Sequence, residues 1–377
     1  MKQSIVALIR PKLNLAQKED QAAHLIEHIL AEPKRLKSLG ITDDFYAQNI
    51  IVHGGSINDY FATEYGIVRS EVADQIAEMI SNHRNELHIE RSDFENVRSV
   101  IIEEIKDDEG EFIDLGKQIS NVIYEPGSPS SRNPRNNLES ILNLSYDKAI
   151  DIFNKYNSDH SLLKLAFDDY RIDKIPSIER NVLRQDIRLV ELAHPWQSPD
   201  SIETFIVVPI PKSTDLLINL LYSRSLTDDY FGIVYNEIRH NNGLVYDISL
   251  GMDYNINTLE IYFTSSKEGA GKVVDLIKKS LGNYDSFIEK NLEYIKGRIK
   301  FELALDWGDI QNQSFTMINR VVSGGFAETP ESMIKRVETV TAADLCKFNR
   351  LYLDSLNQKS LIIKRRHAKS PATEIVE

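Results

Sequence analysis

The chain has 377 residues, of which 42% are hydrophobic and 27% are charged, proportions that are ordinary for a globular protein. At roughly 100–200 residues per domain, this length indicates two domains, or three at most. The 44 Lys and Arg residues against 57 Asp and Glu give a formal net charge of −13, which argues against a nucleic-acid-binding protein. The only cysteine is Cys346, so an internal disulfide is excluded.

The N-terminal segment MKQSIVALIRPKLN lacks the long apolar core and the small-residue cleavage site of a secretory signal. Elsewhere, no apolar run approaches the roughly 18–20 residues that a membrane span needs. One basic cluster near the C-terminus is interpreted as a solvated strand end, and it consists of Lys364, Arg365, Arg366 and Lys369. We therefore expect a soluble cytoplasmic protein with no membrane span and no nucleic-acid partner.

Short strand-forming runs alternate with helical patterns along the chain. Strands are predicted where β-branched and aromatic residues gather, at 5–9, 65–68, 205–208, 259–263 and 361–363. Helices are predicted from the spacing of apolar residues at 17–32, 70–83, 94–108, 146–156, 214–224, 229–241, 270–305, 331–338 and 342–352. Strands of this kind mixed with long helices indicate α/β or α+β layers.

A weak internal repeat relates the two halves of the chain. Four residues recur at one spacing of 196 positions, which is the distance from Ser145 to Thr341. In each copy an apolar residue precedes Ser or Thr, whose hydroxyl can cap the amphipathic helix that follows. The repeated pairs are Ile141 with Val337, Leu144 with Val340, Ser145 with Thr341, and Tyr156 with Tyr352. The polar stretch 168–186 is the natural boundary, so we expect domains at 1–180 and 181–377.

The strongest chemical signal is the run His24-Leu25-Ile26-Glu27-His28, in a helical pattern. With His24 at 0° on a helical wheel, His28 lies at about 40° and Glu27 at about 300°, whereas the apolar residues lie opposite. Two imidazoles one turn apart can hold a single Zn²⁺ ion, and the Glu beside them can accept a proton from water. The alternative is a surface helix whose polar residues face solvent.

A third candidate ligand is Glu104, in the predicted helix 94–108. With Val100 at 0°, Glu104 lies at about 40°, on the same side as Val97 and Ile101, whereas Glu103 lies at about 300° on the polar side. A carboxylate on a core-facing stripe needs a partner, because burying it alone is costly. A metal ion would supply that partner, and a buried salt bridge is the alternative.

These residues resemble the pitrilysin/insulysin family of inverzincins, which includes the mitochondrial processing peptidase. That family has H-x-x-E-H on one helix and a third ligand, Glu, at a characteristic distance along the chain, and Glu104 follows His28 at that same spacing. The segment 97–105, VRSVIIEEI, is similar to the family's third-ligand segment. The family also has a Gly-rich strand entry with an Asn and a Thr, and here GGSINDYFAT at 54–63 contains Asn58 and Thr63.

A second family mark lies in the other half of the chain. The run NEIRHNNGLVY at 236–246 matches the pattern F-x-x-[IL]-R-x-x-x-G-L-x-Y after its first position. In the family, this Arg and Tyr contact the substrate or the tetrahedral intermediate, which implies those roles for Arg239 and Tyr246. Both side chains can donate hydrogen bonds to an oxyanion. The alternative is an ordinary helix-to-strand junction with a Gly cap.

The resemblance implies an α+β fold of two homologous layered domains of the mitochondrial-processing-peptidase type, each a mostly antiparallel sheet packed with helices. It identifies the chain as a short, two-domain, bacterial-type subunit, with a zinc-binding peptidase domain at 1–180 and the Arg/Tyr motif at 181–377. The implied activity is that of a zinc-dependent endopeptidase that cleaves short or unfolded peptides. Maturation or trimming of a specific peptide is one role that such an enzyme can have. The implied site has Glu27 as the catalytic residue, Zn²⁺ on His24, His28 and Glu104, and Asn58, Arg239 and Tyr246 as substrate-binding residues.

The resemblance also implies a dimer that encloses its peptide substrate in a chamber. A homodimer is expected because one chain carries both motifs, and a heterodimer with a related subunit stays open. A non-catalytic structural or peptide-binding subunit is the alternative function. Two departures separate this chain from the family: Val97 replaces a Glu that orients a ligand, and Ala31-Glu32-Pro33-Lys34 replaces Phe-x-Gly-Thr. The first departure predicts weaker metal binding or slower catalysis.

Overall fold

The computed structural model describes residues 2–11, 20–82, 90–108, 120–132, 138–156, 160–194, 198–211, 215–254, 256–325, 328–367 and 372–376. The chain forms two compact units. Unit 1 comprises Met1–Asn181 with Asp306–Glu331, and unit 2 comprises Val182–Leu305 with Ser332–Glu377. Within the described ranges, no helix is long and apolar enough to cross a membrane.

Unit 1 contains a five-stranded sheet in which every neighbouring pair is antiparallel, in the order β2-β3-β1-β4-β5. The strands are β1 (Gln3–Pro11), β2 (Ile50–Ile57), β3 (Phe61–Arg69), β4 (Ser161–Ala166) and β5 (Tyr170–Ile172). Successive residues of β1 point to opposite faces, and Ile5, Val6, Ala7 and Leu8 are all fully buried. Both faces of the sheet are therefore covered at its central strand.

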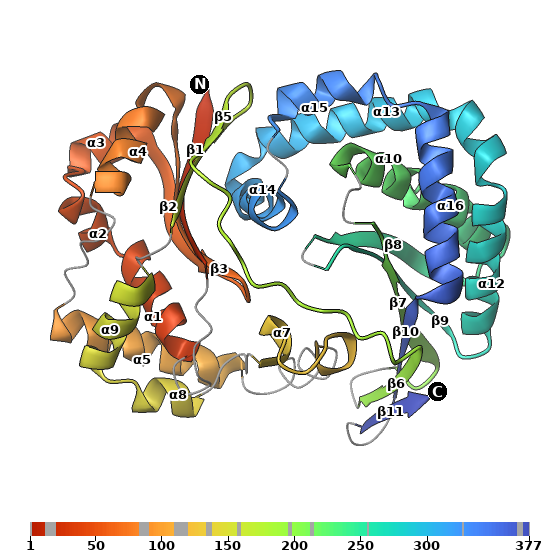
Figure 1. Cartoon of the computed structure of the whole chain (residues 1–377), viewed down its shortest axis with the longest axis horizontal. Coiled ribbons are helices and arrows are strands. Elements are labelled where there is room, and N and C mark those ends of the chain that lie inside the picture. Colours follow the sequence, from red (N-terminus) through yellow and green to blue (C-terminus); the bar gives the residue numbers. More distant parts are fainter. Residues whose placement is uncertain are drawn as a thin grey trace. The chain divides into compact units, whose positions relative to one another are not determined.

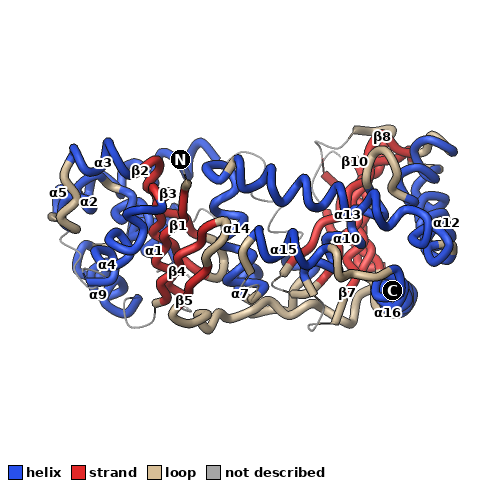
Figure 2. Tube along the Cα trace, turned by 90° about the horizontal axis from the view of Figure 1, so that it is seen from above, coloured by secondary structure: helices blue, strands red, loops and turns tan. Residues whose placement is uncertain are grey.

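Helices cover the two faces of this sheet from different parts of the chain (Figure 1 and Figure 2). One face packs against helices that precede β4 in the chain, and the other against α14 (Ile310–Gly324). Residues 306–331, assigned to the second half by the sequence, lie in unit 1, where Ile318 and Val322 belong to the same apolar cluster as Ile5 and Ala7. The other helices are α1 (Asp20–Ala31), α2 (Pro33–Ser38), α3 (Asp43–Asn49), α4 (Ala73–Asn82), α5 (Arg91–Asp108), α7 (Pro129–Arg132), α8 (Leu138–Asn143) and α9 (Tyr146–Tyr156), with a 3-10 turn at Ser70–Val72.

Unit 2 contains a six-stranded sheet in the order β11-β6-β10-β7-β9-β8. Only β10 and β6 run parallel, and the other described pairs are antiparallel. The strands are β6 (Leu189–His194), β7 (Ser201–Pro209), β8 (Val245–Asp253), β9 (Thr258–Ser266), β10 (Leu361–His367) and β11 (Ala372–Val376). The helices are α10 (Leu216–Thr227), α11 (Ile233–Tyr235), the π-helix Asn236–Asn241, α12 (Gly269–Gly282), α13 (Tyr284–Gly308), α15 (Pro330–Val337) and α16 (Ala342–Gln358). The predicted α+β class, with mostly antiparallel sheets packed with helices, is confirmed.

The helix caps expected from the internal repeat are present in both units. Ser145 accepts a hydrogen bond from the backbone N–H of Lys148 at 3.2 Å, and Thr341 accepts one from Asp344 at 3.3 Å. The repeat extends to α1 and α10, because the two helices are equal in length and their first residues, Asp20 and Leu216, have the same spacing as Ser145 and Thr341. The prediction of one helix at 270–305 is wrong, since Asn283 separates α12 from α13.

The two units bury different polar groups. In unit 1, Glu64 is fully buried and accepts a hydrogen bond from Arg35 Nε at 3.1 Å, with Arg10 Nη2 at 3.7 Å from its other oxygen. In unit 2, the rings of Tyr222 and Tyr352, both fully buried, have centroids 5.4 Å apart. Strand β3 and helix α2 are thus joined by buried ions, whereas α10 and α16 are joined by aromatic rings.

Candidate metal centre

Helix α1 carries its polar and apolar residues on opposite sides. Leu25, Ile26 and Ile29 are buried in a cluster with α5, α8 and α9. This packing fixes the direction of the opposite side, which bears His24, Glu27 and His28. The predicted helix ends at Ala31, and Pro33 occupies the first turn of α2, where a missing N–H is tolerated.

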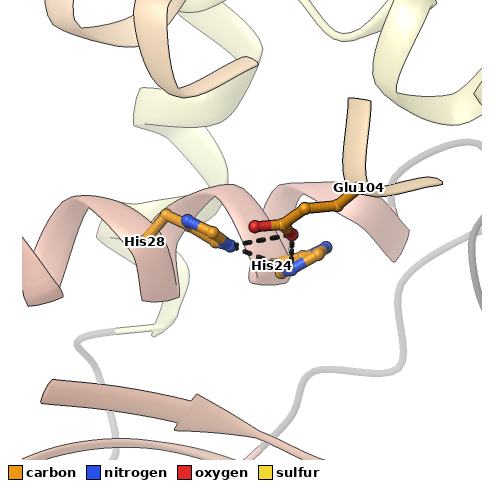
Figure 3. Close-up of side chains that lie close together, drawn as sticks. All are labelled: His24, His28 and Glu104. Carbon is orange, nitrogen blue, oxygen red and sulfur yellow. Dashed lines mark hydrogen bonds and ion pairs between the residues drawn. The ribbon is translucent and has the colours of Figure 1, made fainter. Parts of the chain in front are cut away.

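The structure brings His24, His28 and Glu104 together although they come from two helices (Figure 3). The two imidazole Nε2 atoms lie 3.1 Å apart, and Glu104 Oε2 lies 3.5 Å from His24 Nε2 and 3.3 Å from His28 Nε2. Among the described residues, this is the one cluster of three or more His, Cys, Asp or Glu that can hold a metal ion.

The donor set fits a divalent transition metal. Two imidazole nitrogens and one carboxylate oxygen are the ligands of many zinc sites with an open position. His24 Nδ1 lies 3.1 Å from Gln21 Oε1, and an amide oxygen only accepts hydrogen bonds. The proton of this imidazole therefore belongs on Nδ1. The lone pair of Nε2 then faces the other two potential metal-ligand atoms, which are on His28 and Glu104.

The expectation that Glu104 lies on a core-facing stripe is wrong. Its side chain is 45% exposed, and Val100, one turn earlier, is 49% exposed. The buried stripe of α5 runs through Phe94, Val97, Ile101 and Ile105. Because each residue adds about 100° on a helix, Glu104 lies at the margin of that stripe. Glu104 reaches the two imidazoles from a solvent-accessible side. Its short distances to them, and not its burial, therefore identify it as a candidate ligand.

Glu27 is enclosed much more tightly than Glu104. Its side chain is 15% exposed, and its Oε2 lies 3.8 Å from His28 Nε2. Burial raises the pKa of Glu27, the nearby His28 opposes that rise, and the charge of Glu104 adds to it. A carboxylate in this setting binds a proton more readily than an exposed one, as a general base requires.

Strand β2 passes so close to Glu27 that one of its residues has no room for a side chain. A Cβ on Gly55 would lie 2.8 Å from the Glu27 carbonyl oxygen and 2.9 Å from its Oε1. By contrast, a Cβ on Gly54 would meet only Tyr65, at 3.6–3.7 Å. The Gly-rich stretch at 54–55 was a signal in the sequence, but the contact with α1 was not predictable from it.

Asn58 lies in the turn between β2 and β3. Its Oδ1 accepts hydrogen bonds from the backbone N–H groups of Tyr60 at 2.8 Å and Phe61 at 2.9 Å. Asn commonly stabilises a turn in this way. The carbonyl oxygen of the side chain therefore shapes the hairpin, and contact with a substrate stays a prediction.

Arg239 and Tyr246 lie together in unit 2. The Arg239 guanidinium carbon lies 4.7 Å from the centroid of the Tyr246 ring and 5.6 Å from that of Tyr235, within the range of cation–π contacts. Arg239 belongs to the π-helix, a feature that is frequent at functional sites. Gly243, with φ +62°, donates its N–H to the Arg239 carbonyl at 3.1 Å, so the junction also has the expected Gly cap. Tyr246 is 83% exposed.

The sequence matches no known family profile and no curated protein. Solved structures do match. A protease from Helicobacter pylori is 13% identical, with a TM-score of 0.65 over 97% of this chain and 94% of its own. An M16 peptidase inactive domain from Pseudomonas fluorescens is 12% identical, with a TM-score of 0.64 over 98% of this chain and 94% of its own.

The ferredoxin protease FusC, solved in complex with Arabidopsis ferredoxin, is 10% identical, with a TM-score of 0.66 over 98% of this chain. This chain spans 43% of that protein's length. Identities of this size show the fold alone. The chain has the fold shared by M16-type peptidases and M16-like inactive domains, which is the pitrilysin-like fold.

Proposed function

We propose that this chain is a zinc-dependent endopeptidase that cleaves short or unfolded peptides. The observation that carries the proposal is the meeting of His24, His28 and Glu104, with Glu27 enclosed beside them. The three would hold Zn²⁺ and leave a fourth position open. The fold shared with proteases supports the same activity.

Each protein group has a chemical task in this proposal. When bound, Zn²⁺ lowers the pKa of water and polarises the scissile carbonyl. Glu27 accepts the proton of the attacking water and passes it to the leaving amine, and its raised pKa suits both transfers. Arg239 and Tyr246 donate hydrogen bonds to the developing oxyanion. Their contact with each other, at 4.7 Å, supports a joint role.

Strand β2 offers a place for the substrate backbone. It is an edge strand with β3 as its neighbour in the described sheet, and its Gly55 lies against Glu27. An extended peptide that pairs with this edge would pass beside the catalytic base, in the manner of strand addition. Asn58, which shapes the end of β2, would hold the edge in position.

The proposed assembly is a dimer that encloses the peptide. One chain carries both the metal group, which is His24, His28 and Glu104, and the Arg239–Tyr246 pair, and this supports a homodimer. A heterodimer with a related subunit is the other possible arrangement. Sedimentation of the purified chain, alone and with a partner from the same source, distinguishes the two. The cytoplasmic location stays a prediction, which cell fractionation tests.

A non-catalytic peptide-binding subunit is the second candidate. The specific observation in its favour is the match to an M16 inactive domain, together with Val97 in place of the family's Glu. The presence of Glu27 and of all three metal-group residues favours the peptidase.

Zinc content and cleavage of unstructured peptides, measured on the same samples, test the proposal. We expect one zinc per chain in both wild type and Glu27→Gln, and cleavage lower by about 10²–10⁴-fold in the variant. Glu103→Gln is the matched control, because Glu103 is 69% exposed and pairs with Lys106 rather than the metal group. Stoichiometric zinc without Glu27-dependent cleavage of any peptide would reject the peptidase in favour of the non-catalytic subunit.

A further inference from the structure

Gln21 is a buried polar residue that the proposed chemistry does not use. It lies on α1 one turn before His24, outside the H-x-x-E-H run, and is 5% exposed. Its Oε1 lies 3.1 Å from His24 Nδ1. Burying a polar side chain costs free energy unless it is hydrogen-bonded. Gln21 is buried with its amide oxygen beside the ring nitrogen of His24 that does not face the other candidate ligands, which calls for an explanation.

The contact determines which nitrogen of His24 carries the proton. Gln21 Oε1 accepts only, so Nδ1 is the donor and Nε2 keeps its lone pair. That Nε2 atom lies 3.1 Å from His28 Nε2 and 3.5 Å from Glu104 Oε2. The ring is therefore held in the tautomer and the orientation that a metal ligand requires.

The neighbouring helix offers no acceptor at the position where the resemblance places one. Val97 on α5 is 5% exposed and belongs to the same apolar cluster as Leu25 and Ile26. Gln21 is itself anchored, since its backbone N–H donates to Ser140 Oγ on α8 at 3.4 Å. The acceptor beside His24 Nδ1 in this chain is therefore an amide oxygen on α1.

We propose that Gln21 is a positioning residue of the metal centre, which fixes the tautomer and direction of His24 for metal binding. The inference rests on the proposed metal site, but not on peptidase activity. Groups behind a metal-bound His typically contribute about 10- to 100-fold to metal affinity. The neutral amide performs the task without adding negative charge beside Glu27 and Glu104.

Zinc affinity of the full chain, measured by competition with a chromogenic chelator, tests the proposal. Gln21→Met keeps the length of the side chain and removes the acceptor, so we expect zinc binding to weaken by about 10- to 100-fold. Gln21→Glu keeps an acceptor oxygen and should bind zinc close to wild type.

Nitrogen NMR of the His24 ring in the zinc-free chain gives a readout that a merely structural role would not change. We expect protonated Nδ1 in wild type and a mixture of tautomers in Gln21→Met, with an unchanged urea midpoint. Wild-type zinc affinity and tautomer in Gln21→Met would overturn the inference, as would equal losses in Gln21→Met and Gln21→Glu. A wild-type chain that binds no zinc would overturn both proposals. A chain that cleaves no peptide but loses zinc affinity in Gln21→Met would uphold this inference and reject the peptidase.

Discussion

The hairpins β2–β3 and β8–β9 occupy equivalent places in the two units. Gly55 pairs with Glu64 in the first hairpin, and Gly251 pairs with Glu260 in the second, both at the spacing of the internal repeat. Gly55 lies against Glu27, whereas a Cβ on Gly251 would meet nothing within 4 Å. The same backbone pairing therefore occurs at a crowded edge in unit 1 and at an open edge in unit 2.

Glu64 and Glu260, which pair with these two glycines, also differ in their pKa values. Burial alone would raise the pKa of Glu64, but the nearby His53 ring and the charges of Arg35 and Arg10 outweigh it and hold the pKa at about 2. Burial, aided by the charge of Asp253, raises the pKa of Glu260 to about 7. Equivalent positions thus favour opposite protonation states, because their neighbours and not the strand decide the charge.

The metal group has no equivalent in unit 2. The repeat places Leu220, Ser223, Arg224 and Lys300 at the positions equivalent to His24, Glu27, His28 and Glu104, in that order. Arg224 instead pairs with Glu302 at 2.8 Å. Unit 1 bears the candidate metal ligands, and unit 2 bears the Arg239–Tyr246 pair.

The largest expected effect is the loss of the buried ion cluster in unit 1. Glu64→Gln removes the charge of the buried carboxylate that faces Arg10 and Arg35, which costs about 3–5 kcal/mol in the free energy of unfolding. Urea unfolding followed by circular dichroism gives the size of the loss. Glu260→Gln is the equivalent change in unit 2, and it should cause no loss at pH 8. Equal losses in the two variants would show that the units do not differ in this respect.

Tyr246→Phe should come next in size. It keeps the ring against Arg239 and removes the hydroxyl, so kcat for peptide cleavage should fall by about 10²–10³-fold, as for the loss of one oxyanion donor. Tyr230→Phe is the control, because Tyr230 lies in the same region and is 86% exposed. Equal rates in the two variants would remove Tyr246 from the proposed site.

Gly55→Ala tests the crowded edge directly. The new methyl group would displace the Glu27 carboxylate or β2, and a displacement of about 1 Å costs about 10²-fold in kcat. Zinc content should stay at the wild-type level. Gly251→Ala and Gly54→Ala, which have ordinary space for a methyl group, should cleave at the wild-type rate. A fully active Gly55→Ala would show that the contact does not position the base.

The smallest effect is a pH dependence of opposite sign in the two units. The stabilisation from ionised Glu64 is complete above its ordinary pKa of 4.5 and is lost as the pH falls towards 2. For Glu260 the stabilisation is complete below pH 4.5 and is lost as the pH rises through 7. Because Glu260 is partly exposed, we expect the free energy of unfolding of unit 2 to fall by about 1–2 kcal/mol as the pH rises from 4.5 to 7.

Hydrogen-exchange mass spectrometry at pH 4.5 and 7.5, corrected for the intrinsic rate, reports each unit separately. Glu260→Gln should abolish the difference in unit 2. A pH dependence that persists in this variant would assign the effect to another group.

The sequence predicts those parts of the site that depend on local spacing. His24, Glu27 and His28 lie within two turns, so helical geometry alone places them together. Glu104 lies beside His24 and His28, as its spacing from His28 implies, but the burial that the helical wheel predicts for it is wrong. The contacts of Gly55 with Glu27, and of Glu64 with Arg10 and Arg35, join segments that are distant in sequence, and no local pattern encodes them.

The secondary-structure elements of the fold also divide into those that a local sequence pattern predicts and those that it does not. Strands with strong β-propensity, such as β1 and β9, were predicted within a few residues. Strands β2 and β8 contain Gly or alternate irregularly, and they were missed. The sequence prediction also lacks α14, whose place in the fold depends on a sheet with strands much earlier in the chain.

The return of α14 to unit 1 has a consequence for synthesis. A ribosome releases the five strands of the first sheet long before it releases residues 310–324, which cover Ile5, Phe61 and Leu163 on one face of that sheet. During this interval the nascent chain exposes an apolar sheet face that chaperones can bind and that other chains can join. A stop codon anywhere before residue 310 would therefore leave even the first unit incomplete.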